Sequence, residues 1–212
     1  MIIYGSTMSP FVRKALAFAA EAGVPVEHHP VGLGSKNPEF LQASPFRKIP
    51  ALRDGDYTLC DSSAIIHYLD ALRPSGLIPA GAQARGKTIW WDEFADTIFV
   101  AAAGKLFFNR VVSPLFLKRP GDLAAADKAE AEELPPILAH LEAALPASGF
   151  LVDDRLTLAD IAVASPFANL AHAGHVLDTA TYPRLAAYAA SILARPAFAG
   201  MVLAETAALA GG

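Results

Sequence analysis

Hydroxyl side chains crowd the first predicted turn of the chain, in the stretch IIYGSTMSPFVRKALAF at residues 2–18. Ser9 stands directly before Pro10, an order typical of a helix N-cap followed by the first helical position. A serine hydroxyl has one donor and two acceptor sites. It can therefore accept a capping bond from a helix N–H and still donate its proton to a thiolate. Ser9 is a candidate for both roles, whereas Thr7 and Ser6 come earlier and are loop groups or fallback donors.

A second group of polar residues, Asp61-Ser62-Ser63, opens another predicted helix. The first N–H groups of a helix have no partner and its dipole favours a negative group. A ligand carboxylate would fit there, with a further bond from the Ser62 hydroxyl, and Asp61 would bind an ammonium group. The alternative is that one of these three side chains only caps the helix.

The Ile49-Pro50 bond stands where an irregular segment enters a predicted strand. A trans proline is ordinary at the start of a strand, whereas a cis bond is found in only about 5–6% of X-Pro bonds. A cis bond would turn the Ile49 backbone N–H and C=O outward, where they can pair with another extended chain. Ser9, Ile49 and Asp61-Ser62 together complement an extended peptide with a thiol, one free ammonium and carboxylates. Glutathione is such a peptide.

Short apolar runs and turn signals predict an α/β unit around these residues. Residues 1–5 and 24–31 are expected to form strands on either side of a helix over residues 10–22, which gives a βαβ unit. The dipeptide Asp54-Gly55 is a strong hairpin signal between two further strands. One short helix is expected near Glu39–Gln42 and a longer one over residues 62–72.

The remainder of the chain is expected to be helical. Residues 73–84 are rich in proline and glycine, and no convincing strand follows them. Thr157 and Asp160 are spaced as a capping box at a helix start. The helical patterns run over residues 85–110, 122–145, 157–173, 182–194 and 196–209. We therefore expect two domains, residues 1–78 and 85–212, with a linker at 79–84.

Two side-chain patterns on the predicted helices bear on the core. Arg13, Lys14, Ala17 and Glu21 are expected to form a narrow solvent-facing stripe on the first helix. An aromatic-rich stretch at the start of the second domain has two interpretations. It forms an interdomain or dimer core, or part of it lines a pocket for an apolar co-substrate. The stretch comprises Trp90, Trp91, Phe94, Phe99, Phe107 and Phe108.

Composition excludes several classes of protein. The 212-residue chain is long enough to bury a sizeable core, and its one cysteine, Cys60, excludes an internal disulfide, as is usual in a reducing cytoplasm. A net charge of −4 without a basic block argues against a nucleic-acid partner. No apolar run reaches the roughly 18 residues of a membrane span. His172 and His175 lack neighbours at metal-ligand spacing, so no metal site is expected.

These features resemble a cytosolic glutathione transferase. The resemblance rests on Ile49-Pro50-Ala51-Leu52, on Asp61-Ser62-Ser63-Ala64-Ile65 and on the helical second half, and it is specific over residues 1–78. It implies a thioredoxin-like α/β domain followed by an all-α domain, and a homodimer as the working form. Ser9 falls at the position where serine-type members of the theta and zeta kinds carry the catalytic side chain. Cysteine-type members of the omega kind carry their catalytic side chain at the same position. A theta- or zeta-like bacterial member is therefore expected.

The resemblance also implies a role for each residue of the site. Ile49 would pair its backbone with the cysteinyl part of glutathione, next to a cis Pro50. Ser62 would take the γ-glutamyl carboxylate and Asp61 the γ-glutamyl ammonium, although Asp61 is shorter than the glutamate more often found there. Two positions that resemble contacts to the glycyl end are Lys48 and, less well aligned, Lys36.

The expected function is that of a cytoplasmic glutathione transferase with a role in detoxification. The Ser9 hydroxyl would stabilise the glutathione thiolate, which attacks a small apolar electrophile, and glutathione is the co-substrate without a metal. Two alternatives stay open: a glutathione-dependent isomerase or dehalogenase that uses the same thiolate, and a non-catalytic glutathione-binding interaction protein. Disulfide reduction fits less well, because Ser9 stands in place of the cysteine that a mixed disulfide requires.

Overall fold

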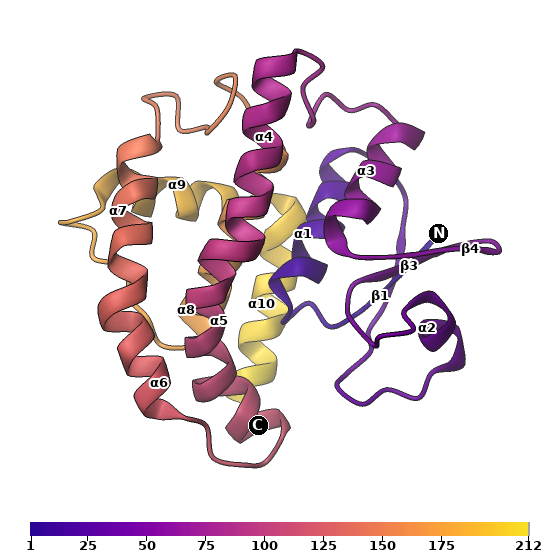
Figure 1. Ribbon diagram of the computed structural model, residues 1–212, viewed down its shortest axis with the longest axis horizontal. Helices are drawn as coiled ribbons and strands as arrows, with labels where there is room; N and C mark the ends of the chain where they lie inside the picture. The colour runs from indigo at the N-terminus through magenta and orange to yellow at the C-terminus, as the bar shows by residue number, and fades with distance from the viewer. Residues whose placement is uncertain (212) are drawn as a thin grey trace.

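A computed structural model describes residues 1–211 of the chain, and it has the expected α/β part followed by a helical part. Figure 1 shows the first part, in indigo and violet, beside a bundle of helices that runs from magenta to yellow. The elements of the first part are β1 (Ile2–Tyr4), α1 (Pro10–Glu21), β2 (Glu27–His29), α2 (Pro38–Ala43), β3 (Ala51–Asp54), β4 (Tyr57–Cys60) and α3 (Ser62–Leu72).

Helices make up the second part, apart from an isolated bridge between Val152 and Arg155. The segments η1, η2 and η3 are π-helical, and short π-helical turns inside α-helices are frequent at functional sites. The elements are α4 (Ala82–Phe94), η1 (Ala95–Phe99), α5 (Val100–Phe107), η2 (Phe108–Phe116), α6 (Leu123–Lys128), η3 (Ala129–Glu133), α7 (Leu134–Ala144), α8 (Leu158–His172), α9 (Pro183–Leu193) and α10 (Pro196–Ala210).

The sheet is four-stranded with the order β2-β1-β3-β4. β1 pairs in parallel with β2 and antiparallel with β3, and β3 pairs antiparallel with β4. The predicted hairpin is confirmed, but Asp54 pairs with Tyr57, so the loop is Gly55-Asp56, one residue later than the Asp54-Gly55 dipeptide that indicated it. β2 is shorter than the predicted strand over residues 24–31. Pro25 and Pro30 cannot donate to a ladder, and the Val24 N–H instead donates to Ala19 O at the end of α1.

The helix that follows the first domain starts earlier and ends later than predicted. α4 begins at Ala82, inside the expected linker at 79–84, with Gly81 as its N-cap. Its continuation through η2 reaches Phe116 even though Pro114 lies inside it. The division at residues 1–78 and 85–212 stays a prediction, and its last residue, Gly212, lies outside the described part of the chain.

The continuous helix from Ala82 to Phe116 is long and apolar enough to cross a membrane by length and composition, with a mean hydropathy of 1.3 in its most apolar stretch. The sequence led us to expect no such segment, because charged residues interrupt its apolar runs. A buried core helix passes the same test. This helix packs along α8, of which every residue from Leu158 to Leu170 is buried, and 39% of the residues in its own most apolar stretch are buried.

The predicted capping box at the start of α8 is confirmed. The Asp160 carboxylate accepts hydrogen bonds from the backbone N–H of Thr157 and Leu151, both at 2.9 Å, and from the Thr157 hydroxyl at 3.2 Å. Burial raises the pKa of Asp160 to about 6, against the opposing effect of these donors. The box therefore fixes both the first turn of α8 and the loop before it.

The predicted solvent stripe on α1 is wrong. Arg13 and Ala17 are 0% exposed and Lys14 is 1% exposed. α1 is covered on one side by α3 and on the other by α8 and α10 (Figure 1). Both cations therefore lie inside the molecule, where a charge must be paired.

Lys14 is paired with two carboxylates of the helical part. Its Nζ lies 2.7 Å from Oδ1 of Asp92 and 2.6 Å from Oδ2 of Asp96. The Ser63 hydroxyl also donates to Asp92, at 2.8 Å. Because one cation serves two acids, the cluster carries an excess negative charge. Burial raises the pKa of Asp96 to about 6, and the repulsion from Asp92 adds to this, although Lys14 opposes it.

The raised pKa of Asp96 predicts that replacing its carboxylate stabilises the protein, by an amount that depends on pH. Between the unfolded value of 3.8 and the folded value of about 6, the folded state binds more protons, so ionised Asp96 lowers the free energy of unfolding above pH 6. Asp96→Asn should raise that free energy at pH 7.5 by up to about 3 kcal/mol. The gain should disappear at pH 4, and urea unfolding at both pH values measures it.

The exposed neighbour Glu93 provides the control for this prediction. Glu93→Gln should change the free energy of unfolding by less than about 0.5 kcal/mol at either pH. An Asp96→Asn protein that is less stable than wild type at pH 7.5 would show that the attraction of Lys14 outweighs the desolvation of the carboxylate.

Candidate active site

Four chain segments leave the sheet at one edge. β1 and its parallel neighbour β2 end there, antiparallel β3 begins there, and β4 ends there. The register pairs Ala51 with both Tyr4 and Cys60. The turn that contains Ser9, the Ile49-Pro50 bond and the Asp61-Ser62 helix start are therefore neighbours in space. Loops at such an edge carry the functional side chains while the sheet supplies rigidity.

A cavity of about 550 Å³ opens between this edge and the helical part. Its walls are mostly apolar, and the helical side contributes only glycine, valine and phenylalanine side chains. The lining residues of the sheet side are Ser6, Met8, Ser9, Pro10, residues 31–35, Phe40, Arg47 and Ile49, and those of the helical side are Gly104, Phe107, Phe108, Val112 and Phe116. This interdomain cleft has the size and lining of a site for a small ligand.

Ser9 lies where the sequence predicted, as the N-cap of α1 with Pro10 at the first helical position. Its side chain lines the interdomain cleft but makes no capping hydrogen bond. The Ser9 hydroxyl therefore does not cap α1 and is available to form a hydrogen bond with a ligand. The N-terminus of a 12-residue helix points at the same place and adds a partial positive charge.

The two other hydroxyls of the turn differ from Ser9 in their surroundings. The Ser6 side chain lines the cleft, but its Oγ accepts the Met8 N–H at 3.3 Å. Thr7 is not part of the lining. Burial raises the pKa of Glu205, whereas His172 and Arg13 lower it, and a hydrogen bond from the Thr7 hydroxyl adds to this lowering.

The Ile49-Pro50 bond is cis, as predicted, and Ile49 lines the cleft. Gly5 allows the turn over residues 6–9, which carries the Ser6, Thr7 and Ser9 hydroxyls and is called the hydroxyl turn below, to approach Ile49. Gly5 has a φ of +146°, and a Cβ there would lie 2.5 Å from Cγ2 of Val12 and 3.1 Å from Cβ of Ile49. Any other residue would push the turn away from the neighbouring loop.

Asp61 and Ser62 lie just beyond the cleft and do not line it. Asp61 is the N-cap of α3, and its Oδ1 accepts the N–H of Ser63 at 3.0 Å and of Ala64 at 3.1 Å. Its φ of 82° is in the region that residues with a side chain rarely adopt. Ser62 is 2% exposed, and its hydroxyl lies 3.4 Å from Oδ2 of Asp96. The capping alternative thus applies to Asp61, while Ser62 faces the Lys14 cluster.

The two lysines expected at the glycyl end are exposed and do not line the cleft. Each is one residue away from a lining residue, Lys36 from Ser35 and Lys48 from Arg47. Arg47, which the sequence did not single out, is the one charged residue of the lining and has a φ of 56°. Arg47 stands directly before Lys48 in a polar loop, so no sequence pattern distinguished it as a site residue.

The aromatic stretch of the first long helix divides between the cleft and the core of the helical part, so its first residues do not form the interdomain core that the sequence suggested, and the dimer core stays a prediction. Phe107 and Phe108 line the cleft, together with Val112 and Phe116 further along the helix. Trp90, Trp91 and Phe94 instead gather around His140 of α7, and Phe99 packs on Phe167 of α8. Sequence reasoning missed Val112 and Phe116 because the predicted helix ended at residue 110.

The remaining candidates carry no chemistry in this arrangement. His172 lies 3.0 Å from Glu205 and His175 lies 2.6 Å from Glu130. Within residues 1–211 no group of three or more His, Cys, Asp or Glu side chains is placed to hold a metal ion, and the absence of a metal stays a prediction.

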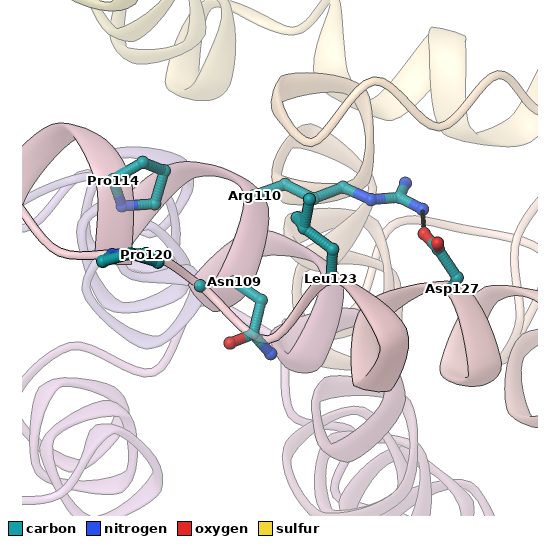
Figure 2. Close-up of a pocket in the computed structure, with 7 residues that line it drawn as sticks. Asn109, Arg110, Pro114, Pro120, Leu123 and Asp127 are labelled. Carbon is teal, nitrogen blue, oxygen red and sulfur yellow. Dashed lines mark hydrogen bonds and ion pairs between the residues drawn. The ribbon is translucent and has the colours of Figure 1, made fainter.

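A second cavity, of about 500 Å³, lies at the far end of the long helix (Figure 2). Figure 2 shows Arg110 directed away from the two prolines and toward Asp127, which it meets at 2.8 Å. Arg110 also contacts Glu130. The one cation of this cavity is already paired with two carboxylates, and no hydroxyl or thiol side chain within residues 1–211 lines the cavity. We therefore do not assign the reaction to it. Its lining is Asn109, Arg110, Pro114, Pro120, Gly121, Leu123 and Asp127.

Both halves of the chain match one family. Residues 3–77 match the family described as Glutathione S-transferase, N-terminal domain, and residues 101–196 the one described as Glutathione S-transferase, C-terminal domain. Glutathione S-transferase 3 of Zea mays is 36% identical over 95% of this chain and 93% of that protein. A structure of glutathione S-transferase I from mais in complex with an atrazine glutathione conjugate is 28% identical, with a TM-score of 0.83 over 95% of this chain and 96% of that chain.

A theta-class structure from Xanthomonas axonopodis pv. citri with glutathione bound is 30% identical, with a TM-score of 0.78 over 95% of this chain and 96% of that chain. The curated relatives, however, include several plant proteins with F-type names. They point to the plant F (phi) type, which corrects the expectation of a theta- or zeta-like bacterial member. Because a 36% identical relative spans nearly the whole chain and both halves match, the chain belongs to the glutathione S-transferase family.

Proposed function

We propose that this glutathione transferase binds glutathione along the sheet edge and activates its thiol by a hydrogen bond from Ser9. The observation that carries the proposal is the Ser9 hydroxyl, which lines the interdomain cleft at a helix N-terminus and is not used as a cap. The thiolate then attacks a small electrophile held in the same cleft. The protein supplies thiolate stabilisation and orientation and needs no general base.

The magnitudes support this mechanism. A thiol with a pKa near ~8.5 is mostly protonated at neutral pH, and lowering that pKa by about two units requires roughly 2.7 kcal/mol in favour of the thiolate. A hydrogen bond to a charged group contributes roughly 1.5–3 kcal/mol, and a helix N-terminus up to ~2 kcal/mol. Ser9 and the α1 dipole together supply the required free energy.

The rest of glutathione would extend from Ser9 past Ile49 to the start of α3. Ile49, next to Pro50, would pair its backbone with the cysteinyl part, since it lines the cleft beside the hydroxyl turn. Ser62 would take the γ-glutamyl carboxylate at the helix N-terminus, and Asp61 its ammonium. Lys36 and Lys48 would steer the glycyl carboxylate, from positions next to the lining.

The electrophile would be apolar. The helical wall of the cleft presents Phe107, Phe108 and Phe116 together with Val112. Such a wall offers contact area and no charge to a co-substrate. Isomerisation or dehalogenation would use the same thiolate, and we keep it as the second enzymatic function. We further propose a cytoplasmic location and a role in detoxification, in line with the single cysteine and the transferase family.

Ser9→Ala tests the thiolate role. It should raise the pKa of the bound glutathione thiol by about one unit or more, because each unit corresponds to about 1.36 kcal/mol of lost stabilisation. Turnover at neutral pH should fall and partly recover at alkaline pH, where the thiol ionises unaided. The ultraviolet absorbance of the thiolate during a pH titration measures the pKa.

Ser62→Ala is the matched control, because it removes a hydroxyl from the other end of the proposed site. It should weaken glutathione binding about 10-fold while the thiol pKa of the bound fraction stays at the wild-type value. If Ser9→Ala leaves the titration unchanged and Thr7→Ala or Ser6→Ala shifts it, Ser9 is the wrong hydroxyl. Glutathione binding without turnover of any electrophile would instead indicate a binding protein.

We also propose that the working form is a homodimer. Large apolar side chains are exposed on the segment before β3, on β4 and along α4 and η1. Phe46 is 83% exposed, and Tyr57, Trp90 and Ile98 are each close to half exposed. Covering such side chains with a second copy removes apolar area from water, which favours association.

The expected result at micromolar concentration is a sedimenting species of about twice 22.3 kDa. Phe46→Ser should shift it toward the monomer because it removes the most exposed aromatic ring from the interface. The control is Val176→Ser, since Val176 is 86% exposed but lies in the loop after α8. A wild-type protein that sediments as a monomer contradicts the proposal.

A further inference from the structure

A buried arginine lies directly behind the hydroxyl turn. Arg13 follows Ser9 by one turn of α1, and the Arg13 N–H donates to the Ser9 carbonyl at 3.0 Å. The Arg13 guanidinium donates to the two carboxylate oxygens of Glu205, from Nε at 3.2 Å and from Nη2 at 2.8 Å. This bidentate arrangement is typical of strong arginine–carboxylate pairs. It joins the start of α1 to α10, which lie side by side (Figure 1).

The third guanidinium nitrogen of Arg13 holds two residues of α8. Nη1 donates to the carbonyl oxygen of Ser165 at 2.8 Å and to Oδ1 of Asn169 at 2.9 Å. Ser165 and Asn169 are 1% and 2% exposed. Because Oδ1 of Asn169 faces Arg13, its amide nitrogen must point the other way, toward the hydroxyl turn.

These two residues of α8 bond to the backbone on both sides of Ser9. The amide nitrogen of Asn169 donates to the Met8 carbonyl at 2.8 Å, and the Ser165 hydroxyl donates to the Pro10 carbonyl at 2.7 Å. The residues before and after Ser9 are thus both anchored to the helical part. Neither bond satisfies a helix terminus of α8, since both residues lie inside that helix.

The Glu205 carboxylate is itself fixed by further groups. His172 Nε2 lies 3.0 Å from its Oε2. Burial alone would raise the pKa of Glu205, but His172, Arg13 and the Thr7 hydroxyl together lower that pKa below its usual value. Glu205 is therefore ionised at neutral pH, and Arg13 keeps its counterion there.

This anchoring matters because Ser9 has no capping bond to fix its own side chain. The direction of its hydroxyl depends on the backbone on either side. A hydrogen bond weakens steeply below about 120°, and a misplacement of about 1 Å can lower a rate about 100-fold. A rigid Ser9 backbone thus preserves a short and well-aligned bond to the thiolate.

We infer that Ser165 and Asn169, held by the Arg13–Glu205 pair, are positioning residues that aim the Ser9 hydroxyl at the glutathione thiolate. This inference rests on the proposed role of Ser9. It makes thiolate activation by the α/β part depend on α8 and α10 of the helical part. It assigns a catalytic consequence to four side chains that do not line the cleft.

Ser165→Ala tests the inference with a small change. It removes the hydrogen bond to the Pro10 carbonyl and the longer one, at 3.3 Å, that the Ser165 hydroxyl accepts from Nη1 of Arg13. It keeps the hydrogen bond from Nη1 to the Ser165 carbonyl. The thiol pKa of bound glutathione should rise by about half a unit, which is about a three-fold loss of thiolate well below the pKa. kcat at about pH 5.5, roughly one unit below the lowered thiol pKa, should fall about three-fold and recover at alkaline pH, while KM for glutathione changes less than two-fold. Glu205→Gln should act in the same direction.

A double variant separates positioning from general stability. In the Ser9→Ala protein there is no hydroxyl to aim, so adding Ser165→Ala should leave the thiol pKa unchanged. The melting temperature should still fall by the same amount as in the wild-type background. Additive shifts of the thiol pKa in the double variant would overturn the inference, because they would show that Ser165 acts without Ser9.

Glu21→Gln is the matched control for Glu205→Gln. Glu21 accepts two hydrogen bonds from Arg195, at 2.7 and 2.8 Å, so it also links α1 to the helical part, but at the far end of α1. It should lower the melting temperature without moving the thiol pKa. If Ser9→Ala shifts the thiol pKa while Ser165→Ala and Glu205→Gln do not, the positioning role is wrong. If Ser9→Ala itself leaves the pKa unchanged, the proposed function fails instead.

Discussion

The structure depends on the burial of two adjacent cations on α1. Arg13 and Lys14 are enclosed between the sheet and the helical part, and each needs a carboxylate that the first domain does not supply. Glu205 comes from α10, and Asp92 and Asp96 come from the first long helix. An unpaired buried charge costs several kcal/mol. The two parts of the chain are therefore held in one relative orientation by charge pairing as well as by apolar contact.

That orientation creates the interdomain cleft. The sheet brings four loops to one edge, and this places the hydroxyl turn beside Ile49 and the start of α3. The helical part then closes the other side with an apolar wall of phenylalanine and valine. Polar groups for one substrate and apolar surface for another thus meet at Ser9. Neither part alone would form the complete site.

The two charge clusters serve different ends of the proposed glutathione site. The Arg13–Glu205 pair anchors α8 behind the hydroxyl turn, where the thiol would lie. The Lys14 cluster contacts Ser62 and Ser63 at the start of α3, where the γ-glutamyl group would lie. Burial, with a smaller contribution from the nearby Asp92 carboxylate, raises the pKa of Asp96 in this cluster. The helical part is thereby linked to both ends of the site through α1.

The sequence by itself determined the local features of this protein. Turn chemistry and capping patterns act over a few residues, so Ser9-Pro10, the Gly55 hairpin, the start of α3 and the Thr157–Asp160 box were all predictable. The same motifs carried the resemblance to the glutathione transferases. The order of an α/β part and a helical part followed from the periodicity of apolar residues.

Only the tertiary structure decided which faces are covered. The sequence assigned Arg13 and Lys14 to solvent, because periodicity identifies a polar stripe but cannot show a carboxylate that arrives from a distant helix. The partner of Arg13 is 192 residues away along the chain. The sequence also could not show that Arg47 and Phe116 line the cleft, because this depends on where the loop before β3 and the end of the long helix lie. The face of α1 that carries Arg13 and Lys14 is therefore buried because distant segments pack on it, and local sequence preference does not determine this.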